Sequence, residues 1–225
     1  HSLHEYGIIS CMNRFEGIIF DFNGTMFLDN DFHIRAWIAF AARHGVEMTR
    51  ELYIDLFHGL ASKESLEQLL GREIDQQTSL AMQEEKEAIY RQLCLDDPLH
   101  FRLAPGLERL LDELSAAGVP MAIATASAET NVTFFIAEFV LERWFEREHI
   151  VFDDGSFRNK PHPDIYLRAA ERLGIIPGRL VVVEDSLIGA AAAERAGIGR
   201  ILLTGERAFG IEELELRFPG TRFIT

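Results

Sequence analysis

The segment GIIFDFNGT, residues 17–25, decides the fold. Its first four residues are apolar and rich in isoleucine, which is typical of a short strand buried on both faces of a parallel sheet. The polar turn that follows contains a glycine and predicts that the strand ends at Asp21. We therefore expect a carboxylate at the end of a buried strand, followed by Gly24, which lets the backbone approach a ligand closely.

Four later segments repeat the apolar character of this strand, and helical periods lie between them. The expected strands are residues 119–125, 149–152, 180–184 and 199–203. The expected helices are residues 106–117, 129–139, 163–173 and 186–196. This alternation predicts an α/β fold with a doubly wound, Rossmann-like parallel sheet, in which ligands bind at the carboxyl ends of the strands.

The stretch from Asp31 to about Pro98 breaks this alternation, because it carries several helical periods and no strand pattern. We expect it to form a helical cap domain inserted after the first strand. The predicted α/β core domain then comprises residues 12–29 and 99–225, and the predicted cap comprises residues 30–98. Residues 1–11 are expected to be an optional N-terminal extension or a cloning remnant, and no function is assigned to them.

The charge balance is strongly acidic, with 36 acidic residues, 22 basic residues and a formal net charge of -14. Such a charge disfavours nucleic acid and anionic membrane surfaces as partners. No apolar run is long enough to span a bilayer, and the first residues lack the pattern of an export signal. The two cysteines are too few for a disulfide framework. We therefore expect a cytoplasmic protein. A monomer or a weak dimer is a separate expectation, which none of these features tests.

Two segments with phosphate-binding chemistry follow the first and second expected strands. Asp21 is a candidate nucleophile toward phosphorus, which would form an aspartyl phosphate; an aspartate that only caps a turn is the alternative. Thr125 ends the second strand, and Ala126 and Ser127 follow it, where hydroxyl and N–H groups near a helix N-terminus are able to cradle phosphate oxygens. Ordinary helix capping is the alternative for these residues.

Two further segments supply charges of opposite sign. Lys160 lies beside two prolines in NKPHPD, residues 159–164, and is a candidate for neutralising both the nucleophile and a transferring phosphoryl group. Glu184 and Asp185 are adjacent at the end of a very apolar strand, where they would repel each other unless a cation were present. Oxygen ligands of this kind favour Mg²⁺, although two helix-capping acids are the alternative.

Taken together, D-x-x-G-T, a strand-terminal threonine, K-P-x-P-D and a strand-terminal E-D resemble the four motifs of the haloacid dehalogenase-like superfamily. The resemblance covers residues 15–203, and the combination is specific although no single motif is. Residues 33–37, HIRAW, and residues 59–66, GLASKESL, are similar to the cap of the β-phosphoglucomutase-like branch.

This resemblance implies a phosphoryl-transfer enzyme with Mg²⁺ as cofactor and a small phosphorylated metabolite, such as a sugar phosphate, as its substrate. Asp21 would be the nucleophile, Thr125 would bind the transferring phosphoryl group, and Lys160 would stabilise charge. The metal ligands would be the carboxylates of Asp21, Glu184 and Asp185 and the backbone carbonyl of Asn23. Substrate contacts are expected from Gly24, Thr25, Ala126 and Ser127, and from His58 and Lys63 in the cap, although a solvated lysine is the alternative for Lys63.

Asn23 departs from the family pattern, because phosphatases and mutases of this superfamily normally have a second aspartate at this position that shuttles protons. An amide lacks that chemistry, and general acid–base assistance contributes about 10²–10⁴ in rate. Three explanations stay open: His33 supplies the proton, Asn23 is an engineered trap, or the enzyme is weakened. A structural histidine that only forms hydrogen bonds is the alternative for His33.

Four functions are consistent with the sequence. The leading hypothesis is a phosphatase whose cap excludes solvent and selects the substrate. A β-phosphoglucomutase-type isomerase is favoured by HIRAW and disfavoured by Asn23. A phosphonate hydrolase would use a cap lysine for Schiff-base chemistry, and Lys63 lies one residue from the expected place. A sensor that binds Mg²⁺ and phosphate without catalysis is the non-enzymatic alternative.

Overall fold

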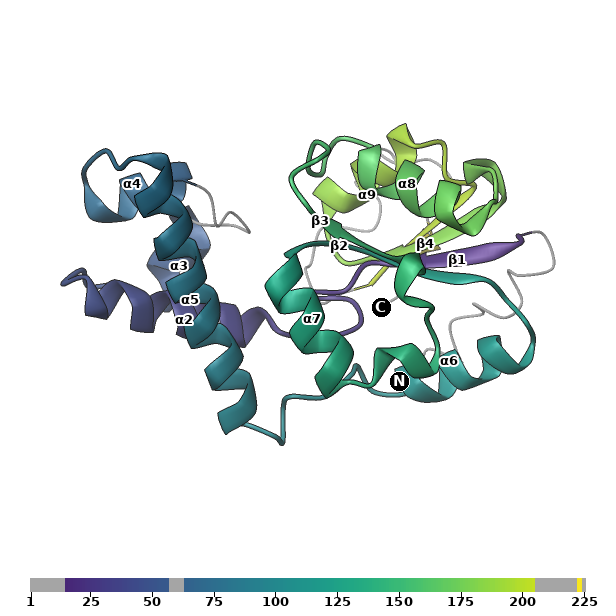
Figure 1. Ribbon diagram of the computed structural model, residues 1–225, viewed down its shortest axis with the longest axis horizontal. Coiled ribbons are helices and arrows are strands. Elements are labelled where there is room, and N and C mark those ends of the chain that lie inside the picture. Colours follow the sequence, from purple (N-terminus) through teal and green to yellow (C-terminus); the bar gives the residue numbers. More distant parts are fainter. Residues whose placement is uncertain (1–14, 57–62, 205–221, 224–225) are drawn as a thin grey trace. The chain divides into compact units, whose positions relative to one another are not determined.

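The computed structural model describes residues 15–56, 63–204 and 222–223, and it divides into two compact units (Figure 1). One unit is Asp29–Arg102, and the other consists of the chain on either side of that segment. The sequence predictions for residues 1–11 and for His58 lie outside the described residues.

The larger unit contains a six-stranded sheet of order β3-β2-β1-β4-β5-β6, in which every neighbouring pair is parallel. Its strands are β1 Gly17–Phe20, β2 Met121–Ala128, β3 Ile150–Asp153, β4 Leu180–Glu184, β5 Arg200–Leu203 and β6 Arg222–Phe223. The predicted α/β fold is confirmed, and the first five strands lie where the apolar runs predict them. Strand β6 has two residues, too few for a recognisable pattern.

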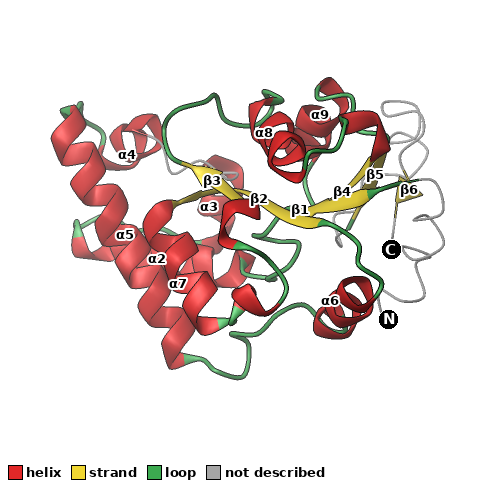
Figure 2. Ribbon diagram, turned by 45° about the vertical axis from the view of Figure 1, so that its right-hand side comes forward, coloured by secondary structure: helices red, strands yellow, loops and turns green. Residues whose placement is uncertain are grey.

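Helices cover both faces of this sheet. They are α6 Leu107–Ala116, α7 Glu129–Glu138, α8 Asp164–Leu173 and α9 Leu187–Arg195. Helices α8 and α9 lie on one face, and α6 and α7 lie on the other (Figures 1 and 2). Because successive side chains of a strand point to opposite faces, Ile19 joins the buried cluster beneath α8 and α9, whereas the Phe20 ring packs edge-on against Phe145 at 6.3 Å.

Two residues at the end of β2 correct a prediction. Ala126 and Ser127 were expected in a turn after the strand, but β2 continues to Ala128. The register with β3 shifts between Ala124 and Ala128, and Ala128 then pairs with Asp153. An irregularity of this kind bends a strand and re-aims its side chains, and no periodicity in the sequence signals it.

The smaller unit is helical in its described part. Its helices are α2 Asn30–Arg43, α3 Arg50–Leu56, α4 Lys63–Leu70 and α5 Gln76–Asp96. Asp75 caps the start of α5, because its carboxylate accepts a hydrogen bond from the Thr78 N–H at 2.8 Å and so satisfies one of the free donors of the first turn. In the described part of the chain, every helix is too short or too polar to cross a bilayer.

Candidate active site

Asp21 follows β1 directly and is almost completely buried. Its backbone N–H donates to the Val183 carbonyl at 2.9 Å, which carries the pairing of β1 with β4 one residue beyond the strand. The Lys160 ammonium donates to Asp21 Oδ1 at 2.6 Å. The nucleophile candidate is therefore held by a backbone hydrogen bond from the sheet and by the partly buried Lys160 ammonium.

Lys160 lies between two carboxylates. Its Nζ donates to Asp21 Oδ1 and, at 2.7 Å, to Glu184 Oε1. Burial lowers the pKa of Lys160, but the negative charges of Asp21 and Glu184 outweigh burial and hold that pKa well above its usual value. The ammonium therefore keeps its charge in this partly buried position.

The two carboxylates that share this ammonium differ in proton affinity. Burial raises the pKa of Asp21 to about 7, against the lowering effect of the Lys160 charge. Burial also raises the pKa of Glu184, but Lys160 and hydrogen bonds from Ser186 outweigh it, and that pKa lies below its usual value. Lys160 and Ser186 together therefore favour the ionised form of Glu184, whereas burial favours the protonated form of Asp21.

A group of acidic side chains stands at the carboxyl ends of β1 and β4. Oxygen atoms of Asp21, Glu184 and Asp185 all lie within 4.8 Å of one another. When all three carboxylates are ionised, they and the Lys160 ammonium carry a net charge of -3 + 1 = -2. Oxygen ligands around a charge of this size fit a divalent hard cation such as Mg²⁺.

Two glycines make room for these carboxylates. A Cβ atom at Gly24 would overlap the Asp185 carboxylate, and Gly24 also has a φ of +79°, in the left-handed region. A Cβ atom at Gly189, in the first turn of α9, would overlap the Glu184 carboxylate. The Asp185 carboxylate therefore lies directly against Gly24, and the Glu184 carboxylate lies directly against Gly189.

Asn23 and two hydroxyl residues form a second part of the site. Asn23 Oδ1 accepts hydrogen bonds from Ser127 Oγ at 2.7 Å and from Thr125 Oγ1 at 3.1 Å. The Ser127 N–H donates to Thr125 Oγ1 at 3.1 Å. Residues more than 100 positions apart in the sequence therefore meet at the carboxyl ends of β1 and β2, whereas the neighbouring Ala126 is exposed. Thr25 lies buried in the turn after β1.

His33 lies in the smaller unit, where both of its ring nitrogens are engaged. Its Nε2 is 3.1 Å from Asp29 Oδ2, and its Nδ1 is 3.1 Å from the Lys86 ammonium. The ring also stacks on Tyr90, with centroids 4.2 Å apart. Since an ammonium only donates, Nδ1 accepts and Nε2 donates to Asp29. This arrangement supports the structural alternative for His33, because neither nitrogen has a free position for a proton transfer.

Lys63 also lies in the smaller unit, at the start of α4. Its Nζ donates to Glu67 Oε1 at 2.6 Å, one helical turn further on. This hydrogen bond raises the pKa of Lys63. A lysine that forms a Schiff base needs the opposite shift, toward the neutral amine, and the geometry therefore disfavours the phosphonate-hydrolase hypothesis.

The sequence reasoning missed two residues that contact the acidic group. The Ser186 N–H and Oγ donate to Glu184 Oε2 at 2.7 and 2.9 Å. The Tyr166 hydroxyl donates to Glu184 Oε1 at 3.1 Å. Ser186 had a signal, since a serine directly before a helix is a common N-cap, whereas Tyr166 has the spacing of an ordinary core residue of α8.

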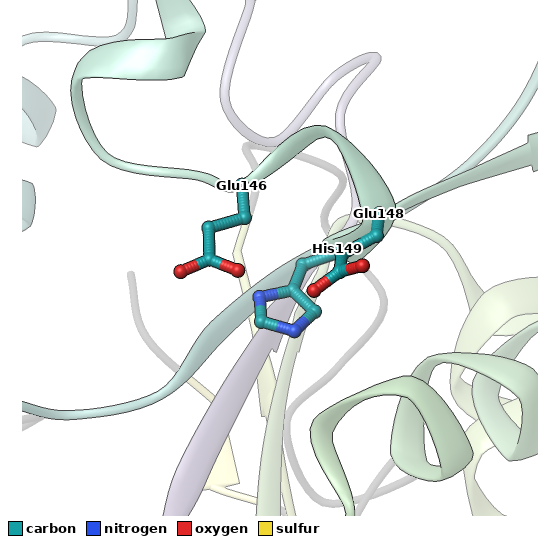
Figure 3. Close-up of side chains that lie close together, drawn as sticks. All are labelled: Glu146, Glu148 and His149. Carbon is teal, nitrogen blue, oxygen red and sulfur yellow. The ribbon is translucent and has the colours of Figure 1, made fainter.

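A second group of potential metal ligands, Glu146, Glu148 and His149, lies on one short turn (Figure 3). Both glutamates are exposed. The turn leads into β3 and therefore stands at the amino end of that strand. Ligands of open parallel sheets bind at the carboxyl ends, which is where Asp21, Glu184 and Asp185 lie.

Comparison with known proteins identifies a family for this arrangement. The family model described as haloacid dehalogenase-like hydrolase matches residues 18–203. Among curated proteins, a phosphorylated carbohydrates phosphatase from Thermotoga maritima is 29% identical over 191 residues, which cover 83% of each chain.

Several solved structures are also similar to this chain. A family IA, variant 3 hydrolase from Entamoeba histolytica has a TM-score of 0.84 and 32% identity, and the match covers 93% of this chain and 92% of that one. An aspartate-to-asparagine mutant of CbbY from Rhodobacter sphaeroides, in complex with xylulose-(1,5)bisphosphate, has a TM-score of 0.76 and 29% identity over 93% of each chain. A β-phosphoglucomutase-like protein from Thermotoga maritima has a TM-score of 0.71 and 25% identity over 93% of this chain and 94% of that one.

Proposed function

Since the chain belongs to the haloacid dehalogenase-like hydrolase family, we propose that it is a Mg²⁺-dependent phosphatase that acts on a small phosphorylated metabolite such as a sugar phosphate. The observation that carries this proposal is the buried Asp21, held 2.6 Å from the Lys160 ammonium beside the carboxylates of Glu184 and Asp185. Relatives named for phosphorylated carbohydrates and a bound sugar bisphosphate support the substrate class.

In the proposed reaction, an Asp21 carboxylate oxygen attacks phosphorus while the bond between phosphorus and the ester oxygen breaks. The products of this step are an aspartyl phosphate and an alkoxide, which takes a proton from solvent water to leave as an alcohol. A water molecule then attacks phosphorus in the intermediate and loses its proton to solvent, which releases inorganic phosphate and restores the Asp21 carboxylate. Lys160 stabilises the charge on the transferring group in both steps.

The residues present fit a magnesium ion. Asp21, Glu184, Asp185 and the backbone carbonyl of Asn23 would hold it, and the -2 charge of the acidic group with Lys160 matches a divalent cation. When bound, Mg²⁺ neutralises the negative charge of the phosphoryl group. The hydroxyl groups of Thr125 and Ser127 would contact the phosphoryl oxygens, close to Asn23.

The same proposal extends to the rest of the molecule. We assign the unit Asp29–Arg102 the role of a cap that selects the substrate. The expectations of a cytoplasmic location and of a monomer or weak dimer stay predictions. Burial raises the pKa of the Cys94 thiol to about 12, so this cysteine is unreactive.

A phosphate-release screen tests the proposal. The chain is assayed on sugar, nucleotide and acid phosphates with Mg²⁺ and with a chelator in excess. We expect release from at least one sugar phosphate, a fall of at least about 100-fold with the chelator, and recovery when Mg²⁺ is returned. Conversion of β-glucose 1-phosphate to glucose 6-phosphate without phosphate release would identify a mutase instead. Thermal stabilisation by ligands without turnover on any substrate would identify a sensor.

Gly24→Ala tests the packing of Asp185 against the loop after β1. Because a methyl group there would overlap the Asp185 carboxylate, we expect Mg²⁺-dependent turnover to fall about 10- to 100-fold, as for other disturbed metal surroundings. Gly118→Ala is the matched control, since Gly118 also has a positive φ, +68°, but has no atom within 4 Å of the added methyl. Both variants carry the same kind of backbone strain, so equal turnover in the two would contradict the packing argument.

A further inference from the structure

Tyr166 is a buried residue of α8 that reaches the acidic group from within the core. Its relative exposure is 0%, and it belongs to the apolar cluster beneath α8 and α9. Its hydroxyl donates to Glu184 Oε1 at 3.1 Å. Burial and the charge of Glu184 hold the pKa of Tyr166 well above its usual value, so the hydroxyl remains a donor.

The Tyr166 hydroxyl is one of four hydrogen-bond donors to the Glu184 carboxylate. Glu184 Oε1 accepts from Lys160 and Tyr166, and Oε2 accepts twice from Ser186, through N–H and Oγ. Each carboxylate oxygen therefore accepts from two donors, and Mg²⁺ would take the place of one of these donors when it binds. The Glu184 carboxylate is therefore fixed in one orientation, with Tyr166 as the only uncharged side chain on Oε1 among the described residues.

The ring of Tyr166 has a second role. The Lys160 Nζ lies 5.0 Å from the ring centroid, a distance at which a cation is attracted by the negative face of an aromatic ring. The same ammonium contacts Asp21 and Glu184. Tyr166 therefore contacts both Glu184, a proposed metal ligand, and Lys160, which donates a hydrogen bond to the candidate nucleophile Asp21.

We infer that Tyr166 is a positioning residue of the proposed Mg²⁺ site, an inference that rests on the proposed function. Its hydroxyl orients Glu184, and the face of its ring attracts the Lys160 ammonium. Neither group touches substrate, so Tyr166 acts through Glu184 and Lys160 alone. Partners that orient metal ligands typically contribute about 10- to 100-fold in metal affinity or activity.

The test is the Mg²⁺ affinity of Tyr166→Phe, measured by isothermal titration calorimetry without substrate. The substitution removes the hydroxyl and keeps the ring, so the core packing of α8 is retained. We expect the Kd for Mg²⁺ to rise about 10-fold or more, and the KM for a phosphate ester at saturating Mg²⁺ to stay within about two-fold of the parent value.

Tyr90→Phe is the matched control. Tyr90 is equally buried and donates to a buried carboxylate, Asp29 Oδ2 at 2.6 Å, but it lies in the other unit. Both variants lose one hydrogen bond to a buried acid, so their melting temperatures should fall by similar amounts. Only Tyr166→Phe should bind Mg²⁺ more weakly.

The outcomes separate this inference from the proposed function. If the parent chain binds Mg²⁺ and Tyr166→Phe binds it equally well, the positioning role is overturned and the phosphatase proposal stands. The positioning role is also overturned if Tyr90→Phe weakens Mg²⁺ binding as much, because the effect would then reflect a general loss of stability. If the parent chain does not bind Mg²⁺ at all, both proposals fail together.

Discussion

Replacing Asp21 with asparagine is expected to lower phosphate release by about 10⁴- to 10⁶-fold, the loss usually seen when a nucleophile is removed. An amide oxygen is too weak a nucleophile to form an acyl phosphate. The substitution is nearly isosteric, and the amide oxygen still accepts the hydrogen bond that Lys160 donates to Asp21 Oδ1 at 2.6 Å. Lys160 also keeps its ion pair with Glu184, so the loss of turnover is not expected to reflect unfolding.

The same variant should be more stable than the parent chain at alkaline pH without Mg²⁺. Burial raises the pKa of Asp21 from 3.8 to about 7 in the folded chain. The folded state then binds the proton more tightly than the unfolded state, so the parent loses stability as pH rises from about 4 through 7. Asparagine carries no such penalty, and we expect a gain of up to about 4 kcal/mol at pH 8 and little gain at pH 4.

Urea unfolding of both chains at pH 4 and pH 8, with a chelator present, measures this difference. Asp96→Asn is the matched control, since Asp96 is an exposed aspartate at the end of α5. Its effect should stay within about 0.5 kcal/mol at either pH. If Asp21→Asn kept the turnover of the parent chain, Asp21 would not be the nucleophile. If its gain in stability did not depend on pH, the raised pKa of Asp21 would be contradicted.

The sequence was sufficient to predict the site residues that lie at the carboxyl ends of strands. Asp21 and Glu184 each follow or end an apolar run, and parallel strands bring their carboxyl ends to one edge of the sheet. That geometry explains why Asp21, Lys160 and Glu184 meet although they are distant in the chain. A strand-end carboxylate is therefore predictable from local pattern together with topology.

The features that sequence reasoning missed depend on contacts without a local pattern. Ser127 contacts Asn23 because β2 bends at a register shift, and no residue pattern in the sequence predicts that shift. Tyr166 has the periodicity of a core residue, and only its hydroxyl links it to Glu184. The sequence left both a proton-transfer role and a structural role open for His33, because its partner Lys86 lies 53 residues away.

Asn23→Asp is expected to raise the turnover of sugar phosphates by about 10²- to 10⁴-fold, the usual contribution of a general acid–base group. An aspartate is nearly isosteric with asparagine and keeps an oxygen for the bonds from Ser127 Oγ and Thr125 Oγ1. Its second oxygen carries the proton that the alkoxide needs on leaving, and the resulting carboxylate then accepts a proton from the attacking water. The amide of Asn23 performs neither transfer.

Two substrates separate these steps. With p-nitrophenyl phosphate the leaving phenolate needs no proton, so the parent chain should form the aspartyl phosphate readily and hydrolyse it slowly. We therefore expect a burst of p-nitrophenol from the parent, whereas Asn23→Asp should turn over steadily. Asn30→Asp, at the exposed start of α2, introduces the same charge outside the site and should leave the burst and the rate unchanged. If Asn23→Asp showed no gain in turnover on any phosphate ester, the missing aspartate would not limit this enzyme. Another step would then be rate-limiting.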